Sequence, residues 1–402
     1  MRILKVTHAY FPFLEKGGPT VKVRAIARAM AARGRQPAIL TVDLGVRAAS
    51  ARLERLEKTR WGWRAFPDGI EAIYLKSLAR YHMLTLNPGL LPFCRDRLSD
   101  FDVVHIYGLY DLLGAGVARA CVARGIPYVV EPMGMFRPIV RSLWLKRVYH
   151  GLFGRTLLER ASRIIATSDQ ERDELTQGGI PGQKILLRRN GIEVPDSLPA
   201  RGVFRRQWHV PEEARLVLFL GRLVAKKSPE LALEAFHGWR TQNAQRRNAV
   251  LVLAGPEEES GYRRKLESLS SQLGLNGAVL FTGPLFDDAK WAAYRDADVF
   301  ILPSQNENFG NTAAEAIACG TPALVTDRCG IAPLVDGRAG LAVPYDQTAL
   351  QAGLARLLDD EGLRRKLQQG CADVARALTW QEPLAAMDAL YAELVAQKSL
   401  RG

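Results

Sequence analysis

Pro303–Asp327 carries the sequence PSQNENFGNTAAEAIACGTPALVTD, which predicts a strand end, a polar loop, a short helix and a second strand in that order. The apolar run 298–302 predicts a buried strand, and the Pro-Ser pair that follows ends it. A helix is expected to begin at Thr312, to continue through small apolar residues and to stop at Gly320. The next apolar run, 323–326, predicts the second strand.

Two carboxylates flank the expected helix start, Glu307 in the loop and Glu315 in the first turn. The backbone N–H groups of 310–313 lie between them, and such a helix terminus favours an anion. A phosphate held between two acceptors for hydroxyl groups has the shape of a nucleotide-sugar. Taken alone, each carboxylate has an equally good structural interpretation: Glu315 as the capping-box partner of Thr312, and Glu307 as a solvated loop acid.

Glu307 and Glu315 form the pattern E-x7-E, with Pro-Ser before it and A-C-G-T-P after it. This order of loop, helix, stop and strand resembles the signature of the glycosyltransferases of family 4, which are retaining enzymes of the GT-B fold. The resemblance implies an α/β protein of two Rossmann-like domains with the active site in the interdomain cleft. It also implies that Glu307 binds the donor sugar's hydroxyls, that Glu315 binds the ribose hydroxyls, and that the donor site includes Phe309, Gly310 and Asn311.

A second loop supplies cations. The apolar run before Gly221 predicts a strand, and Arg222, Lys226 and Lys227 follow before Ser-Pro begins a helix. Two cations here can neutralise a departing diphosphate, although solvated loop charges are the simpler interpretation. In the resembling family these positions, Arg222 and Lys227, bind that diphosphate. We therefore predict Arg222, Lys227 and Glu307 as the catalytic residues.

A glycine pair precedes the first predicted helix. Residues 3–8 predict a strand and 20–33 a helix, the opening unit of a doubly wound sheet. Gly17 and Gly18 lack Cβ atoms, so the backbone can approach a phosphate there, although a plain turn explains the pair equally well. In the resembling family this loop lies by the reacting end of the donor, which makes Gly18 a donor-binding candidate.

The length of 402 residues indicates two domains. The alternation of strands and helices predicts an acceptor-binding Rossmann-like domain over 1–195, a nucleotide-sugar-binding one over 203–378, and a last helix in 379–402 that crosses back to the first domain. No apolar run reaches the ~18 residues that a membrane-spanning helix needs. The chain opens directly on a strand without a signal peptide, and its five cysteines form no C-x-x-C pair. These features predict a cytoplasmic protein without a structural metal.

The net charge of +13 lies in the first half: residues 1–200 hold 31 Lys and Arg against 18 Asp and Glu, whereas the remainder holds 24 of each. Such a basic half favours an anionic partner, namely a membrane surface, a polyprenyl diphosphate or nucleic acid. The stretch 136–160 interleaves basic residues with Trp144, Tyr149 and Phe153, which suits an anionic lipid surface, or equally two core-facing helices with solvated arginines. No nucleic-acid motif is present, so no nucleic acid is expected as a partner.

The acceptor side is the least regular part of the sequence. We expect a strand at 71–75 and a mobile acceptor-side loop at 80–88. His105 stands near the carboxyl end of a predicted strand, where open α/β sheets place ligands, although a lone strand histidine is more often a packed residue. In the resembling family a histidine often precedes a glycine after the next strand, whereas this chain has Met133 before Gly134. Because methionine carries no proton, Glu131 becomes the alternative, and we take His105, Glu131 and Met133 as acceptor-side candidates.

We therefore predict a metal-independent hexosyltransferase that moves a sugar, with retention, from a nucleotide-sugar substrate to a glycan or polyprenyl-diphosphate-linked acceptor in surface or exopolysaccharide biosynthesis. No cofactor is expected, because the nucleotide-sugar is a substrate. Asp296 and Asp298 match a D-x-D metal motif in spelling only. The localisation expected is the cytoplasm, with peripheral binding to the inner face of the membrane. A catalytically impaired GT-B binding subunit, a nucleotide-sugar epimerase and a nucleic-acid binder are the alternatives.

Overall fold

The computed structural model describes residues 1–14, 18–81, 84–137, 143–243, 246 and 248–400. The chain divides into two compact units. The N-terminal unit is Met1–Arg189 with Trp380–Gly402, and the C-terminal unit is Asn190–Thr379. Residues 190–195, which the sequence analysis placed in the first domain, and residues 196–202, which it left between the two domains, therefore belong to the C-terminal unit. Among the described residues, no helix is long and apolar enough to cross a membrane.

The N-terminal unit is built on one sheet, whose described strands follow the order β11-β10-β9-β8-β1-β2-β5-β4-β3. Neighbouring strands run parallel from β11 to β5, and only β4 and β3 turn antiparallel at the edge. The strands are β1 (Arg2–Val6), β2 (Gln36–Val42), β3 (Leu56–Lys58), β4 (Gly62–Ala65), β5 (Glu71–Leu75), β8 (Val103–Tyr107), β9 (Tyr128–Glu131), β10 (Arg163–Ala166) and β11 (Ile185–Leu187).

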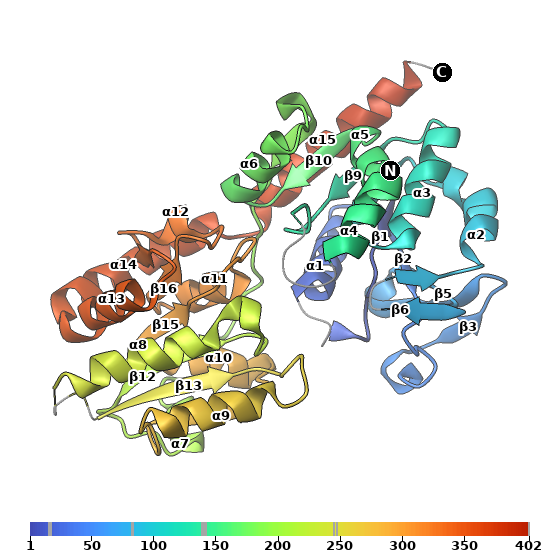
Figure 1. Cartoon of the computed structure of the whole chain (residues 1–402). Helices are drawn as coiled ribbons and strands as arrows, with labels where there is room; N and C mark the ends of the chain where they lie inside the picture. Colours follow the sequence, from blue (N-terminus) through green and yellow to red (C-terminus); the bar gives the residue numbers. More distant parts are fainter. Residues whose placement is uncertain (15–17, 82–83, 138–142, 244–245, 247, 401–402) are drawn as a thin grey trace. The chain divides into compact units, whose positions relative to one another are not determined.

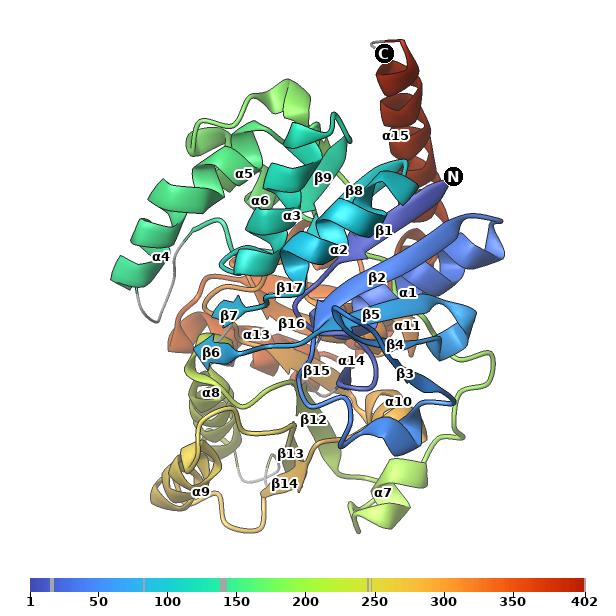
Figure 2. The same ribbon diagram turned by 90° about the vertical axis from the view of Figure 1, so that its right-hand side faces the viewer.

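Alternate residues of this sheet face two separate hydrophobic cores. Leu4 and Leu40 pack on one face, whereas their neighbours Ile3 and Ile39 pack on the other, and all four are fully buried. Helices cover both faces, as doubly wound parallel sheets require (Figures 1 and 2). The helices are α1 (Gly18–Ala32), α2 (Leu90–Arg97), α3 (Leu112–Ala123), α4 (Leu143–Tyr149), α5 (Arg155–Glu159), α6 (Asp169–Gln177) and α15 (Gln381–Ser399), with a π-helical turn at His150–Gly154 between α4 and α5.

The last helix belongs to the N-terminal unit. The side chains of Leu384, Met387, Leu390 and Leu394 on α15 are buried in the same core as Ile3 of β1. Figure 1 shows this red helix beside the strands of the N-terminal unit, from which it is far in sequence. The sequence predicted a helix that crosses back to the first domain, and α15 packs there.

The C-terminal unit holds a parallel sheet in the order β14-β13-β12-β15-β16-β17. Leu216 and Leu218 of β12 face one core while Val217 and Phe219 face another, so helices again cover both faces. The strands are β12 (Arg215–Leu220), β13 (Ala249–Ala254), β14 (Val279–Gly283), β15 (Val299–Leu302), β16 (Ala323–Thr326) and β17 (Gly340–Val343). The helices are α7 (Val203–Gln207), α8 (Pro229–Thr241), α9 (Tyr262–Gln272), α10 (Asp287–Asp296), α11 (Asn311–Ala318), α12 (Ala332–Val335), α13 (Gln347–Asp359) and α14 (Glu361–Ala377).

The structure differs from the sequence prediction in the acceptor-side region. Instead of a loop at 80–88, two short strands, β6 (Ala79–Tyr81) and β7 (Leu84–Leu86), form an antiparallel hairpin. The strands β3 and β4 were also not predicted. Short strands at a sheet edge carry weak periodicity, because only a few residues alternate between a buried and an exposed face.

Candidate active site

Lys227 and Glu307, 80 residues apart, meet in an ion pair in the C-terminal unit. Lys227 ends a short 3-10 turn (Ala225–Lys227) after β12, and Glu307 lies in the loop after β15. These two strands are neighbours in a parallel sheet, so the loops at their carboxyl ends share one edge, where ligands bind in open α/β folds. A backbone hydrogen bond of 3.0 Å from Gln305 N to Lys226 O ties the loops together.

The environment of Glu307 keeps its carboxyl ionised. Burial raises the pKa of this carboxyl, but the charges of Lys227, Lys226 and Arg222 outweigh burial and hold the pKa below its usual value. The Lys227 and Glu307 side chains are 16% and 18% exposed, so the pair is partly shielded yet open to a ligand. An ammonium group held in this way beside a carboxylate can bind a phosphate oxygen while the carboxylate accepts from hydroxyl groups.

The loop that carries Glu307 is fixed by its backbone. Glu307 N donates to Arg328 O at 3.0 Å, and Gly330 N donates to Glu307 O at 2.9 Å, so the loop is bound to the segment after β16. This bracing holds the carboxylate in place before any ligand arrives. Positions fixed in advance lose less conformational entropy on binding.

The start of α11 follows directly. Gly310 precedes the helix with a φ of +110°, and a Cβ atom there would lie 2.9 Å from the Ile331 side chain, so only glycine fits. Asn190 donates to the side-chain oxygen of Asn311 at 3.2 Å. The side chain of Phe309 is buried in the hydrophobic core, so only its backbone remains to contact a donor. Of the donor-binding candidates in this loop, Gly310 and Asn311 thus stand at the helix start itself.

Glu315 is held by two residues of α10 rather than by the backbone at the helix start. Lys290 Nζ donates to one carboxylate oxygen and Tyr294 Oη to the other, each at 2.9 Å. The capping-box interpretation of Glu315 is therefore wrong, because its partners lie on α10 and the helix begins at Asn311 rather than Thr312. The sequence analysis missed Lys290 and Tyr294, although their spacing of four residues puts them on one face of a helix.

Within the described part of the chain, Arg222 forms no hydrogen bond or ion pair with Lys227 or Glu307. Its guanidinium donates to Glu258 at 2.6 Å, and both side chains are 49% exposed. Glu258, in the segment after β13, carried no signal in the sequence. An exposed ion pair of this kind is weak, so Arg222 can exchange Glu258 for a ligand anion at little cost.

Two acceptor-side candidates, His105 and Glu131, are completely buried in the N-terminal unit. Glu131 accepts from Lys22 with one oxygen and from Arg188 at 2.8 Å with the other, and the latter oxygen lies 3.6 Å from His105 Nε2. Burial raises the pKa of Glu131, but the charges of Arg188, Lys22 and Lys5 together lower it by more. The net pKa is below its usual value, so the carboxyl is ionised. Neither side chain is open to an acceptor in this structure.

Met133 and Gly18 are the remaining candidates in the N-terminal unit. Met133 is partly buried and has a φ of +55°, a backbone conformation rarely adopted by residues other than glycine. Gly134 N donates to Glu171 at 2.6 Å, which braces the turn after β9. Gly18 is the exposed first residue of α1, and Gly17 lies outside the described residues.

Two family descriptions match the chain over most of its length. "Glycosyl transferase 4-like domain" matches residues 17–191, and "Glycosyl transferases group 1" matches residues 201–372. The chain belongs to the group 1 glycosyltransferases. This glycosyltransferase is accordingly an enzyme of the GT-B class, as the sequence predicted.

Individual relatives agree with this assignment. The glycosyltransferase is 33% identical to the D-inositol 3-phosphate glycosyltransferase of Streptomyces bingchenggensis, over 58% of this chain and 53% of that one. It is 28% identical to the enzyme of the same name from Xylanimonas cellulosilytica, over 96% and 94% of the two chains. The fold is similar to that of Anabaena Alr3699/HepE, solved with UDP and glucose, with a TM-score of 0.78, 18% identity, and 98% and 100% coverage.

The two aspartates of the D-x-D sequence in this glycosyltransferase, Asp296 and Asp298, have a structural role. Asp296 accepts from the backbone N–H groups of Gly202 and Arg205 at 2.6 and 3.0 Å. Asp298 accepts from the Arg205 guanidinium at 3.2 Å and from Leu216 N at 2.8 Å. Across the described part of the chain, no three His, Cys, Asp or Glu residues are grouped so that they could hold a metal ion.

Proposed function

We propose that this enzyme transfers a hexose, with retention and without a metal ion, from a nucleotide-sugar to a hydroxyl group of a lipid-linked or polysaccharide-precursor glycan. The observation that carries the proposal is the Lys227–Glu307 pair at the carboxyl edge of the C-terminal sheet. It joins a phosphate-binding cation to an acceptor for sugar hydroxyls within one braced loop pair. The matching glycosyltransferase families support the same reaction class.

In the proposed reaction, the bond between the anomeric carbon and the diphosphate oxygen breaks, and the acceptor oxygen bonds to the same face of that carbon. The leaving phosphate oxygen takes the acceptor's proton, so no enzymic nucleophile is needed and Met133 is tolerated. Lys227 and Arg222 neutralise the departing diphosphate together with the start of α11. Glu307 orients the sugar, and Glu315, held by Lys290 and Tyr294, accepts from the ribose hydroxyls.

We propose that the acceptor is lipid-linked and that the enzyme meets it at an anionic membrane surface. The observations behind this proposal are the side chains of α4 and of the π-helical turn. Trp144, Val148, Leu152 and Phe153 are exposed there, although they are large and apolar. Exposed Arg147, Arg155 and Arg160 accompany them. A basic helix with an apolar face of this kind lies in the headgroup region of an anionic membrane. The enzyme then works at the inner face of the cytoplasmic membrane in surface or exopolysaccharide biosynthesis.

A soluble inositol phosphate is the second candidate acceptor. The full-length relative from Xylanimonas cellulosilytica is named a D-inositol 3-phosphate glycosyltransferase. An inositol phosphate would suit the basic N-terminal half equally well, because its charge is negative. It would, however, leave the exposed apolar residues of α4 without a role.

Calorimetric titration tests the donor site with UDP-, GDP-, ADP- and dTDP-sugars in the absence of divalent metal. One donor is expected to bind wild type tightly, and Glu315→Gln and Lys227→Met are expected to bind it at least ~10-fold more weakly. Glu267→Gln on α9, whose exposed carboxylate pairs with Arg263, is the matched control and should bind like wild type. Binding of no donor by folded wild type would overturn the proposal. Binding without transfer to any acceptor would favour an impaired binding subunit.

A further inference from the structure

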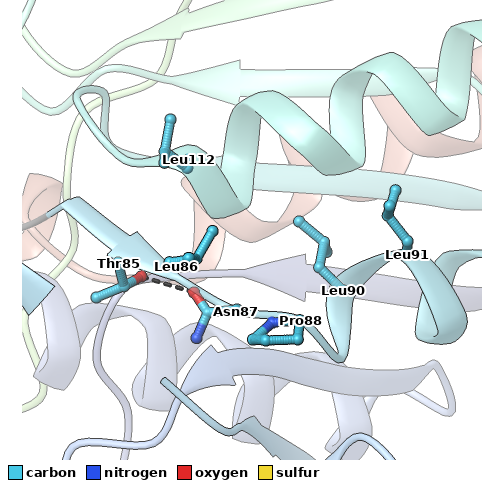
Figure 3. A pocket seen from close by; sticks show the side chains of 7 residues that line it. All are labelled: Thr85, Leu86, Asn87, Pro88, Leu90, Leu91 and Leu112. Carbon is cyan, nitrogen blue, oxygen red and sulfur yellow. Dashed lines mark hydrogen bonds between the residues drawn. The ribbon is translucent and has the colours of Figure 1, made fainter. Parts of the chain in front are cut away.

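A small apolar cavity lies in the N-terminal unit, whereas the candidate donor residues belong to the C-terminal unit. Its volume is about 220 Å³, and it is lined by Thr85, Leu86, Asn87, Pro88, Leu90, Leu91 and Leu112. In Figure 3 the side chains of Leu90 and Leu91 rise from the start of α2 toward α3, whose first residue is Leu112. Leucine-lined cavities of about 150 Å³ already accept benzene, so this cavity has room for a larger apolar group.

The two polar side chains that line the cavity, Thr85 and Asn87, already have hydrogen-bond partners within the protein. Thr85 donates to the side-chain oxygen of Asn87 at 2.7 Å, the bond drawn in Figure 3. The Asn87 amide nitrogen in turn donates to Leu75 O, Lys76 O and Ser77 Oγ at 3.0–3.2 Å. A sugar or nucleotide placed here would lose hydrogen bonds to water without replacing them. The cavity therefore favours a hydrocarbon over a polar ligand.

The cavity opens at an exposed apolar rim. Leu86 and Leu91 line it and are 55% and 77% exposed. Leu78 and Tyr81, on the same hairpin as Leu86, are also exposed. Adjacent exposed apolar side chains of this size mark an interaction surface rather than ordinary solvent exposure.

Basic residues lie beside this rim, and α4 is joined to the start of α3, where the cavity residue Leu112 lies. Arg80 lies opposite Thr85 in the register of β6 and β7. The backbone carbonyl of Lys76 accepts from the Asn87 amide. The side chains of Lys76 and Arg80 are both exposed. Tyr149 at the end of α4 donates to Asp111 O at 2.7 Å, next to Leu112. The exposed apolar residues of α4 thus belong to the same region of the N-terminal unit, and both views of the fold draw α4 near the hairpin.

We propose that this cavity binds the hydrocarbon chain of the lipid-linked acceptor, with the anionic phosphate of that lipid at Lys76 and Arg80. The proposal rests on the proposed function and deepens it, because it names how a lipid acceptor is held. The apolar lining takes the chain, and the exposed cations complement the headgroup. The exposed face of α4 contacts the bilayer from which the chain is drawn.

The test is calorimetric binding of alkyl phosphates of increasing chain length, below their micelle concentrations, with farnesyl phosphate and inorganic phosphate alongside. Affinity is expected to rise about fourfold for each methylene buried and then to level off when the cavity is full. Leu112→Trp, which fills the cavity, should abolish this rise, whereas Val122→Trp, on the exposed far end of the same helix, should not. Leu91→Gln changes only an exposed rim residue and should weaken binding even if Leu112→Trp fails to fold.

Three results would overturn the proposal: no dependence on chain length, equal binding of inorganic phosphate, or equal losses in Leu112→Trp and Val122→Trp. If Leu112→Trp reduced binding to phosphatidylglycerol vesicles as much as binding of farnesyl phosphate, the cavity would hold bulk membrane lipid rather than the acceptor. Donor titrations with the same variants separate the two proposals. A protein that binds its nucleotide-sugar but no alkyl chain refutes only the cavity assignment, whereas failure to bind any donor refutes the proposed function.

Discussion

At the scale of single residues, the charged side chains divide into an open set and a buried set. Lys227 and Glu307 are partly exposed at the edge of the C-terminal sheet, where a ligand can separate them. Lys22, Glu131 and Arg188 are nearly or completely buried in the N-terminal unit. The open set suits binding and catalysis, whereas the buried set resists any change that leaves one charge alone.

Replacing Lys227 tests the open set. In the proposed reaction Lys227→Met removes a cation from the departing diphosphate, so kcat/KM for sugar transfer should fall by roughly 10²–10³-fold. Lys265→Met is the matched control, because that lysine is 65% exposed and pairs with Glu230 on the surface. The measurement is steady-state transfer from the donor identified by calorimetry. Equal activity of the two variants would remove Lys227 from the catalytic residues.

Lys5 makes stability depend on pH. Its ammonium is fully buried and donates to Tyr107 Oη at 3.0 Å. Burial first, and then the Arg188 charge, lowers the pKa of Lys5 from 10.5 to about 7, against the opposing charges of Glu131 and Asp388. Between these two values the unfolded chain binds a proton that the folded chain lacks, so the free energy of unfolding rises with pH across this window.

Lys5→Met should therefore show a smaller rise in the free energy of unfolding than wild type over the same window. Denaturant titrations at intervals between pH 7 and pH 10.5 measure it. Lys366→Met, which changes an exposed lysine on α14, should keep the wild-type slope. A Lys5→Met slope that matches the control would contradict the assigned pKa.

At the scale of elements, α15 completes the N-terminal unit. Its apolar side chains enter the core that holds β1 and α1, and Tyr391 Oη lies 2.5 Å from His105 Nδ1 on β8. The helix is thus held by burial along its length and by polar contacts, which include the ion pairs of Asp388 with Arg33 and Arg35. The N-terminal unit cannot bury its core without this helix, although more than 190 residues separate the two in sequence.

Tyr391→Phe tests this contact. The substitution keeps the ring but leaves a buried imidazole nitrogen without its partner, which should lower the free energy of unfolding by about 1–3 kcal/mol. Tyr81→Phe on the exposed hairpin should change it by less than about 0.5 kcal/mol. Thermal and denaturant unfolding of both variants provide the comparison. An unchanged stability of Tyr391→Phe would show that the hydrogen bond contributes nothing net.

At the scale of the whole molecule, the net charge is distributed unevenly between the two halves of the chain. The excess of 13 positive charges lies within residues 1–200, while the rest of the chain is balanced. The candidate donor residues Arg222, Lys227, Glu307 and Glu315 lie in the balanced part. This distribution of charge matches the proposal that the N-terminal unit binds an anionic acceptor and the C-terminal unit binds the donor.

Vesicle binding tests this division. The enzyme is expected to sediment with phosphatidylglycerol vesicles at low ionic strength and to be released as salt is added, because the Debye length shortens. Replacing Trp144 and Leu152 with Ser should reduce binding even at low salt, since the apolar contact is lost. The matched control replaces Val21 and Val122, also exposed, with Ser. Binding that neither salt nor the Trp144 and Leu152 changes affect would contradict a membrane-facing N-terminal unit.

The sequence by itself determined the family and the longer strands and helices, but not the short strands β3, β4, β6 and β7. The run 102–106 and the apolar run before Gly221 predict buried strands, and the structure has β8 at Val103–Tyr107 and β12 at Arg215–Leu220, each covered on both faces. The E-x7-E pattern identified the family because loop, helix and stop lie within one local stretch. Local signals of this kind need no knowledge of the fold.

Only the tertiary structure decided the partners of each charged residue. The adjacency of β12 and β15 brings Lys227 to Glu307, and the packing of α10 on α11 gives Glu315 its Lys290 and Tyr294. The burial of Glu131 among Lys22 and Arg188 likewise follows from helices and strands far apart in sequence. Sequence periodicity reports which face of an element is apolar, but a partner on another element depends on strand order and packing, which periodicity does not encode.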